Sequence, residues 1–187
     1  LKTISSSFVM ITNTPEFGDN GVFVYSDGGV IPNPTALQLA DIAISSAEKA
    51  RLTAGIKEPK VAFLSFSTKG SADGESVTKV REAIEILKDR NVDFDFDGEM
   101  QLDAAIVPEV AAIKAPGSKV AGYANVLIFP DLNSGNIGYK LTQRLAKAKA
   151  LGPLIQGLAS PVHDLSRGCS VNDIVEVVAI TAVESSQ

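Results

Sequence analysis

Short apolar runs alternate along the chain with longer segments in which apolar residues recur every three or four positions. The apolar runs favour buried β-strands at 8–11, 22–25, 61–64 and 126–129, with a short last strand at 154–155. The periodic segments predict helices with these inward-facing residues: Leu37, Ala40, Ile44 and Ala47; Val77, Val80, Ile84 and Leu87; and Ile137, Leu141, Leu145 and Ala148. This alternation indicates an α/β protein with βαβ units around a mainly parallel sheet.

Helix-start signals set the expected boundaries of these elements. Asn33 is the expected N-cap of the first helix, Pro34 its first residue and Gly55 its terminator. The segment 93–112 is harder to interpret, because alternating aspartates and phenylalanines suggest a strand at its start. The remainder, from Leu102, has helical spacing despite a proline.

The strongest start signal lies near the C-terminus, in the stretch 161–175. Ser170 is a good N-cap residue, and Asp173, three positions later, suits a capping box. The turn 166–169 (Ser-Arg-Gly-Cys) would therefore lead onto a helix N-terminus, where free N–H groups and a guanidinium can bind an anion. The same residues can equally form an ordinary turn and helix start. Arg167 is the only lysine or arginine between 151 and 187, which favours the anion site.

Composition narrows the function classes. The chain has 187 residues, is 45% hydrophobic and 21% charged, and carries a net charge of −5. An acidic balance argues against a nucleic-acid partner, and no apolar run approaches the ~18 residues of a membrane span. A single cysteine excludes an internal disulfide and suits a reducing compartment, so we expect a cytoplasmic protein. One cysteine and one histidine do not form a zinc set, so no metal site is expected.

Further candidate ligands lie before the C-terminal stretch. Residues 133–136 (Asn-Ser-Gly-Asn) could hold an anion at a helix start, or only cap that helix. Lys140, Arg144 and Lys147 form a basic stripe that is either a solvated face or a contact for a polyanion. Because ligands of parallel sheets lie beyond the carboxyl ends of the strands, we expect the loops 65–71 and 130–136 to meet the turn 166–169 there.

Two reactive side chains near that turn, His163 and Cys169, are not expected to be catalytic. His163 is the only histidine, and without an evident oxyanion partner it is interpreted as a structural hydrogen-bonding residue rather than part of a catalytic triad. Cys169 stands at a helix N-terminus, where a thiol pKa is lowered. No base accompanies it for a covalent intermediate, so it is interpreted as a neighbour of the site.

The run 164–170 (Asp-Leu-Ser-Arg-Gly-Cys-Ser), followed by Asp173-Ile174-Val175, closely resembles the C-terminal signature of phosphate acetyltransferases. The segments 97–105, 114–118 and 129–140 carry the resemblance further, until it covers essentially the whole chain. The catalytic unit of that family is nearly twice this length. The chain therefore resembles its C-terminal half.

The resemblance implies interconversion of acetyl-CoA plus phosphate with acetyl phosphate plus CoA, in which CoA is a substrate and no cofactor is covalently bound. It implies two α/β domains around a cleft, a fold resembling the isocitrate and isopropylmalate dehydrogenases, and a homodimer. Residues 1–158 would form the second domain, and 159–187 would return to the first. The N-terminal half would supply further arginines, so this chain alone would be weakly active or inactive.

The same resemblance assigns roles to individual residues. Asp173 would be the general base for the CoA thiol, Ser166 would steady the reacting thiolate or carbonyl oxygen, and Arg167 would bind phosphate. Substrate contacts would come from Arg167, Cys169, Ser134, Asn136, Lys140 and Arg144. Two alternatives remain: a phosphate butyryltransferase, and an acetyl-CoA-sensing regulatory domain without catalysis.

Overall fold

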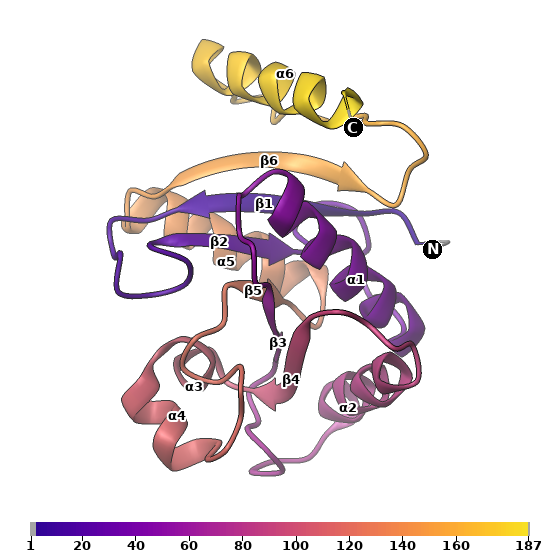
Figure 1. Cartoon of the computed structure of the whole chain (residues 1–187), viewed down its shortest axis with the longest axis vertical. Helices are drawn as coiled ribbons and strands as arrows, with labels where there is room; N and C mark the ends of the chain where they lie inside the picture. Colours follow the sequence, from indigo (N-terminus) through magenta and orange to yellow (C-terminus); the bar gives the residue numbers. More distant parts are fainter. Residues whose placement is uncertain (1–2, 187) are drawn as a thin grey trace.

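The computed structural model describes residues 3–186, and in this range six strands form one mixed sheet accompanied by six helices (Figure 1). The strands are β1 Ser5–Ile11, β2 Val22–Ser26, β3 Lys60–Leu64, β4 Asp95–Met100, β5 Val126–Ile128 and β6 Lys149–Gln156. The helices are α1 Ala36–Leu52, α2 Glu75–Lys88, α3 Leu102–Ile106, α4 Pro108–Lys114, α5 Leu132–Leu145 and α6 Val171–Ser185. The ambiguous segment 93–112 is thus strand, then two short helices, the second beginning at Pro108.

The sheet has the strand order β4-β3-β5-β2-β1-β6. The neighbours among β2, β3, β4 and β5 pair in parallel, which confirms the βαβ prediction for this part of the chain. β1 is antiparallel to both β2 and β6. A short connection between β1 and β2 permits only the antiparallel pairing, because a parallel pair needs a longer crossover.

Helices cover both faces of the sheet. One buried cluster packs α1 and α2 against β3 and β5, and a second cluster packs α3 and α4 against the opposite face. Figure 1 shows α1 and α2 on one side and α3 and α4 on the other. Since both faces are buried, the central strands β2, β3 and β5 are apolar at nearly every position, which explains the continuous runs in the sequence.

The first helix begins later than predicted. Its N-cap is Thr35, whose hydroxyl accepts from the Gln38 N–H at 3.2 Å while the Gln38 side chain accepts from the Thr35 N–H at 2.9 Å. Asn33 is therefore not the cap, and Leu37 is 52% exposed instead of facing inward. Ala40 is fully buried as expected.

The prediction for α5 was wrong about its inward face. Ile137, Leu141 and Leu145 are 57%, 52% and 78% exposed. The helix packs instead through its glycines: a Cβ on Gly135 would lie 2.0 Å from the carbonyl oxygen of Asp27. A side chain here would collide with backbone, so α5 lies too close to the sheet for any larger residue at this position.

The last helix, α6, lies outside the edge strand β6 (Figure 1). Val177 is its one buried residue among those the structure describes. Ile180 is half-buried against the core, and the other large apolar side chains are exposed: Val171, Ile174, Val175, Val178 and Val183. Within 3–186, no helix has the length and apolar character needed to cross a bilayer.

Candidate functional site

The signature turn 166–170 is fixed to the start of α6 by the predicted capping box. The Ser170 hydroxyl accepts from the Asp173 N–H at 3.2 Å, and the Asp173 carboxylate accepts from the Ser170 N–H at 2.7 Å. These hydrogen bonds from Ser170, helped by the positive charges of Lys149 and Arg144, hold the pKa of Asp173 below its usual value despite slight desolvation. The carboxylate is therefore ionised at neutral pH.

The turn is closed by its own backbone. The Cys169 N–H donates to the Ser166 carbonyl at 2.9 Å, and the Gly168 N–H donates to the Ser166 hydroxyl oxygen at 3.3 Å. A Cβ on Gly168 would meet only that hydroxyl, at 4.0 Å. The described part of the fold therefore has room for a side chain at position 168.

A cavity joins this turn to the basic stripe on α5. It has an empty volume of about 1310 Å³ including open solvent. One wall consists of residues of the signature segment: Ser166, Gly168, Cys169, Ser170 and Asp173. The opposite wall consists of residues from α5 and just beyond it: Tyr139, Lys140, Gln143, Arg144, Lys147 and Ala148. The structure thus brings together five of the predicted site residues.

The cavity carries an excess of positive charge. Lys140, Arg144 and Lys147 have no ion-pair partner among residues 3–186, and Asp173 is the single carboxylate in the lining. The ammonium group of Lys140 lies over the ring of Tyr139, 5.7 Å from its centroid. Cations without carboxylate partners around a cavity suit an anionic ligand.

Three of the predicted residues do not line this cavity. Arg167 is exposed outside it, between two residues that do line it. Ser134 and Asn136 lie near the start of α5, where the Ser134 N–H donates to the Asp131 carboxylate at 2.8 Å and the Asn136 amide donates to the Gly28 carbonyl at 3.0 Å. In this structure both have the capping and packing role that was the alternative in the sequence.

The expected meeting of three loops is not observed. Lys149, the first residue of β6, pairs with Ile11, which pairs with Val22 at the start of β2. The cavity is lined by Phe8 of β1 and by Ala150 and Gly152 of β6, and no residue of the loops 65–71 and 130–136 lines it. The loop 65–71 is held instead against the end of β4, where the Gly70 N–H donates to the Glu99 carboxylate at 2.8 Å.

Aromatic residues of the cavity were missed in the sequence. Phe8 and Tyr139 stack with ring centroids 3.9 Å apart and together line its floor. Desolvation raises the pKa of Tyr139, although the charge of Arg144 opposes this. Tyr139 and Gln143 could have been found from the sequence, because they flank the basic stripe on the same helix. Phe8 could not, because it comes from a distant strand and no local pattern connects it to that helix.

His163 has the structural role that was predicted. Its Nδ1 accepts from the Ile155 N–H at 3.2 Å, and its Nε2 lies 3.2 Å from a carboxylate oxygen of Glu184. It does not line the cavity. Among the residues that the structure describes, no group of three or more histidine, cysteine or acidic side chains is arranged to hold a metal ion.

Comparisons with known proteins extend over the whole chain. A phosphate acetyltransferase of Thermoanaerobacterium thermosaccharolyticum is 61% identical over 98% of this chain and 56% of its own length. One from Clostridium acetobutylicum is 59% identical over 100% of the chain and 56% of its own length. The chain spans just over half the length of these relatives.

Solved structures agree with the sequence relatives. A phosphotransacetylase from Streptococcus pyogenes superposes with a TM-score of 0.91 at 49% identity, over 100% of this chain and 55% of that one. The EutD phosphotransacetylase from Staphylococcus aureus gives a TM-score of 0.88 at 46% identity, over 99% and 55%. The sequence model of one family, phosphate acetyl/butaryl transferase, matches residues 1–182. The fold, the signature turn on α6 and these matches agree: the chain belongs to the phosphate acetyl/butaryl transferase family.

Proposed function

We propose that the chain is the C-terminal half of a phosphate acetyltransferase, which moves an acetyl group between the sulfur of CoA and a phosphate oxygen. The observation that carries the proposal is the cavity in which the signature turn faces the unpaired cations Lys140, Arg144 and Lys147. CoA is a polyanion with several phosphate groups, and such a stripe of cations can bind it through charge-assisted contacts. The names of the relatives favour acetyl transfer.

Asp173 is the proposed general base for the CoA thiol. Its lowered pKa keeps it ionised, but it also makes the carboxylate a weak base toward a thiol whose ordinary pKa is ~8.5. The base role therefore requires that the thiol pKa is lowered too, by the cavity's cations and the N-terminus of α6. The thiol proton passes to Asp173 while the sulfur attacks the acetyl carbonyl, and the carbonyl–phosphate bond then breaks to release phosphate.

Ser166 and Arg167 complete the proposed site. Because the Ser166 hydroxyl oxygen accepts from the Gly168 N–H, its own proton is free to donate to the developing oxyanion or the thiolate. Arg167 is exposed outside the cavity, between two residues that line it, and rotation of its long side chain could direct the guanidinium to the phosphate. The spare room beside Gly168 leaves space for a substrate to approach.

The proposed domain division places residues 1–158 in a second domain and 159–187 in the first, in a fold like that of the isocitrate and isopropylmalate dehydrogenases. The exposed valines of α6 support it, because a helix with so much apolar surface normally packs against another layer. The relatives are nearly twice as long, so a further half is available to cover this face. A cytoplasmic homodimer belongs to the same proposal, on the family resemblance alone.

The alternatives differ in what they require of the site. A sensing domain needs the basic stripe but not Ser166, Arg167 and Asp173 together, so the intact set favours catalysis. A phosphate butyryltransferase would use the same chemistry with a longer acyl group. Rates measured with acetyl, propionyl and butyryl phosphates would separate the two enzymes.

The decisive experiment measures acetyl-CoA formed from acetyl phosphate and CoA by this chain, alone and joined to the N-terminal half of a relative. We expect weak or no turnover alone and clear turnover when joined, because further phosphate ligands are expected in the absent half. Arg144→Gln in the joined protein should raise the KM for CoA, and Arg51→Gln, on the distant α1, serves as the matched control. Full turnover by the chain alone would contradict the proposed division of the site.

A further inference from the structure

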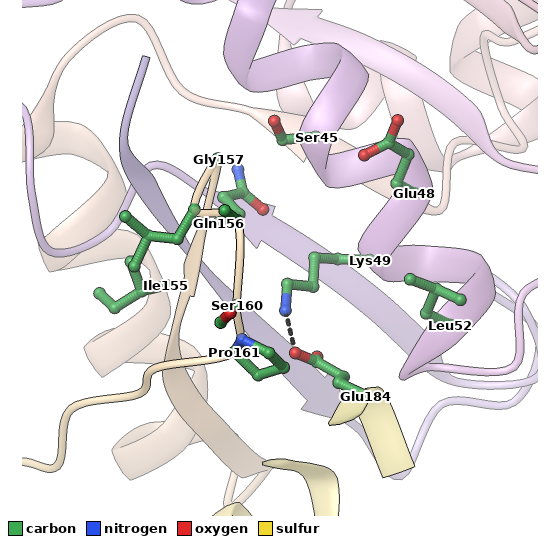
Figure 2. A pocket seen from close by; sticks show the side chains of 12 residues that line it. Ser45, Glu48, Lys49, Leu52, Ile155, Gln156, Gly157, Ser160, Pro161 and Glu184 are labelled. Carbon is green, nitrogen blue, oxygen red and sulfur yellow. Dashed lines mark hydrogen bonds and ion pairs between the residues drawn. The ribbon is translucent and has the colours of Figure 1, made fainter. Parts of the chain in front are cut away.

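A buried group of polar side chains connects the last turn of α6 to α1. Glu184 has a side chain only 5% exposed, and its carboxylate lies 2.5 Å from the ammonium group of Lys49, which is 11% exposed. The Thr53 hydroxyl donates to the other carboxylate oxygen at 2.9 Å. Figure 2 shows Lys49 and Glu184 pointing toward one another from the two helices. A charge buried this deeply is retained only with partners, and Glu184 has several.

The third partner of Glu184 is His163. Its ring is 1% exposed, and Nε2 lies 3.2 Å from the carboxylate oxygen that Lys49 contacts, at ion-pair distance but without the geometry of a hydrogen bond. Because Nδ1 accepts from the Ile155 N–H, the ring proton is assigned to Nε2, on the side of Glu184. Burial lowers the pKa of His163, so the ring is neutral at neutral pH. The imidazole therefore accepts a hydrogen bond from a backbone N–H of β6 and lies against the carboxylate of α6.

These contacts enclose the segment that carries the proposed catalytic groups. His163 stands three residues before Ser166, and Glu184 stands on the same helix as Asp173. The remaining attachments of α6 are few: the buried Val177, the half-buried Ile180 that packs against the core, and an ion pair between Lys149 and Glu176. The placement of the signature turn against α5 thus depends on a small number of contacts, among which the buried polar group is the most extensive.

We propose that Glu184 and His163 are positioning residues that hold the signature turn in register with the cations of α5. The proposal rests on the proposed acetyl transfer for its kinetic consequence, but not for its structural one. Neither residue lines the cavity, so neither touches the substrates. They act through the segment between them: His163 fixes its beginning to β6, and Glu184 fixes its helix to α1.

The first test measures the order of the turn without reference to activity. Trypsin cleaves after Arg167, in the turn, and after Lys119, an exposed residue in the loop beyond α4 that serves as the internal control. We expect His163→Ala and Glu184→Gln to accelerate cleavage after Arg167 at least fivefold and to leave cleavage after Lys119 unchanged. Unchanged cleavage after Arg167 in both variants would overturn the proposal.

The second test separates positioning from general destabilisation. His163→Asn keeps an acceptor near the position of Nδ1, so it should restore protection of the turn that His163→Ala loses. Glu176→Gln removes the other ion pair of α6, which is weak because the Lys149 side chain is 50% exposed, so it is the matched control with an expected effect below twofold. Should Glu184→Gln fail to fold, Thr53→Val removes one hydrogen bond to the same carboxylate and should give a smaller acceleration in the same direction. Equal loss of protection in the asparagine and alanine variants contradicts the proposed role of His163.

The third test is kinetic and uses the joined protein described above. The proposal expects kcat to fall at least tenfold in His163→Ala while the KM for CoA stays within threefold, since Lys140 and Arg144 are unchanged. A rise in KM equal to the fall in kcat would indicate simple loss of structure and would count against positioning. If the unmodified protein transfers no acetyl group, the proposed function fails, and the proteolysis result still decides the placement of the turn.

Discussion

Helices α1 and α6 begin in the same way and end in opposite environments. Each starts with a complete capping box, Thr35 with Gln38 in one and Ser170 with Asp173 in the other. Ten residues of α1 are buried, whereas in α6 Val177 alone is buried among the described residues. A local start signal therefore fixes where a helix begins but not how it is held. Apolar packing holds α1, whereas two apolar side chains, Val177 and Ile180, and a few polar contacts hold α6.

The largest expected effect is a loss of kcat that would distinguish a catalytic capping box from a purely structural one. Asp173→Asn in the joined protein should lower kcat by ~10²–10⁴, because asparagine can still accept from the Ser170 N–H but cannot take a proton. The matched change in α1, Gln38→Ala, should leave kcat unchanged. Initial rates of acetyl-CoA formation measure both. If turnover persists in Asp173→Asn, Asp173 is only a cap, and the two boxes are equivalent.

Truncation of apolar residues should have opposite outcomes in the two helices. Ile42 of α1 is fully buried, so Ile42→Ala should lower the free energy of unfolding by ~2–5 kcal/mol. Val178 of α6 is 61% exposed, and Val178→Ala should cost less than ~0.5 kcal/mol in this chain. Urea unfolding of both variants measures the difference. Equal losses would mean that α6 is packed after all.

Removal of the caps should reveal a smaller difference. Thr35→Ala should lower the free energy of unfolding by ~1 kcal/mol, since α1 unfolds with the body of the chain. Ser170→Ala should destabilise α6 by a similar free energy, but the effect should appear only as fraying of that helix and not in the unfolding of the whole chain. The reason is that α6 contributes little to the core. Hydrogen exchange should show faster exchange confined to the first turn of α6. Loss of protection across the sheet would contradict this.

The smallest effect expected is a difference in pH dependence. Burial lowers the pKa of His163 below 6.5, so the unfolded chain binds its proton first, and stability near α6 should fall as the pH drops below about 6.5. In the body of the chain, burial acts to raise the pKa of Glu99. Hydrogen bonds from Arg81 and Gly70 outweigh this effect and hold that pKa at about 2. The stability that ionised Glu99 contributes is complete above about pH 4.5 and should be lost only as the pH falls below that value.

A pH series of hydrogen-exchange protection, with the first turn of α6 and the strands β2, β3 and β5 as two separate probes, should therefore give two separate midpoints. His163→Asn should remove the one at higher pH, because asparagine does not titrate. A single transition shared by both probes would show that α6 and the body lose structure together.

The sequence correctly predicted the strands and helix starts whose signal lies within a few neighbouring residues. The runs that became β2, β3 and β5 are apolar because both sheet faces are covered, and Ser170 with Asp173 marks the start of α6 by spacing alone. Strand direction has no such local signal, so the antiparallel β1 was not foreseen. The first helix began at Thr35 because its capping partner is a glutamine three positions on, a stronger signal than Asn33 before a proline.

The sequence identified most residues of the candidate site but did not show that they line one cavity. Lys140, Arg144 and the signature turn were identified separately, while their shared cavity depends on how α5 is rotated and on where β6 begins. The rotation of α5 was misjudged because apolar residues were assumed to face inward, whereas Gly135 allows a closer approach than any of them. The stack of Phe8 on Tyr139 joins strand and helix across 130 residues and leaves no local trace.

The close approach at Gly135 has one further consequence for how this protein can change over time. The Asp27 carbonyl occupies the space of any side chain at that position, so α5 cannot turn about its axis without a steric collision. The direction of Lys140 and Arg144 is thus set by backbone contact on one side of the helix. Residues on the far side, such as Leu141, can drift in size and polarity without turning those cations, so the outer surface and the anion site are free to evolve independently.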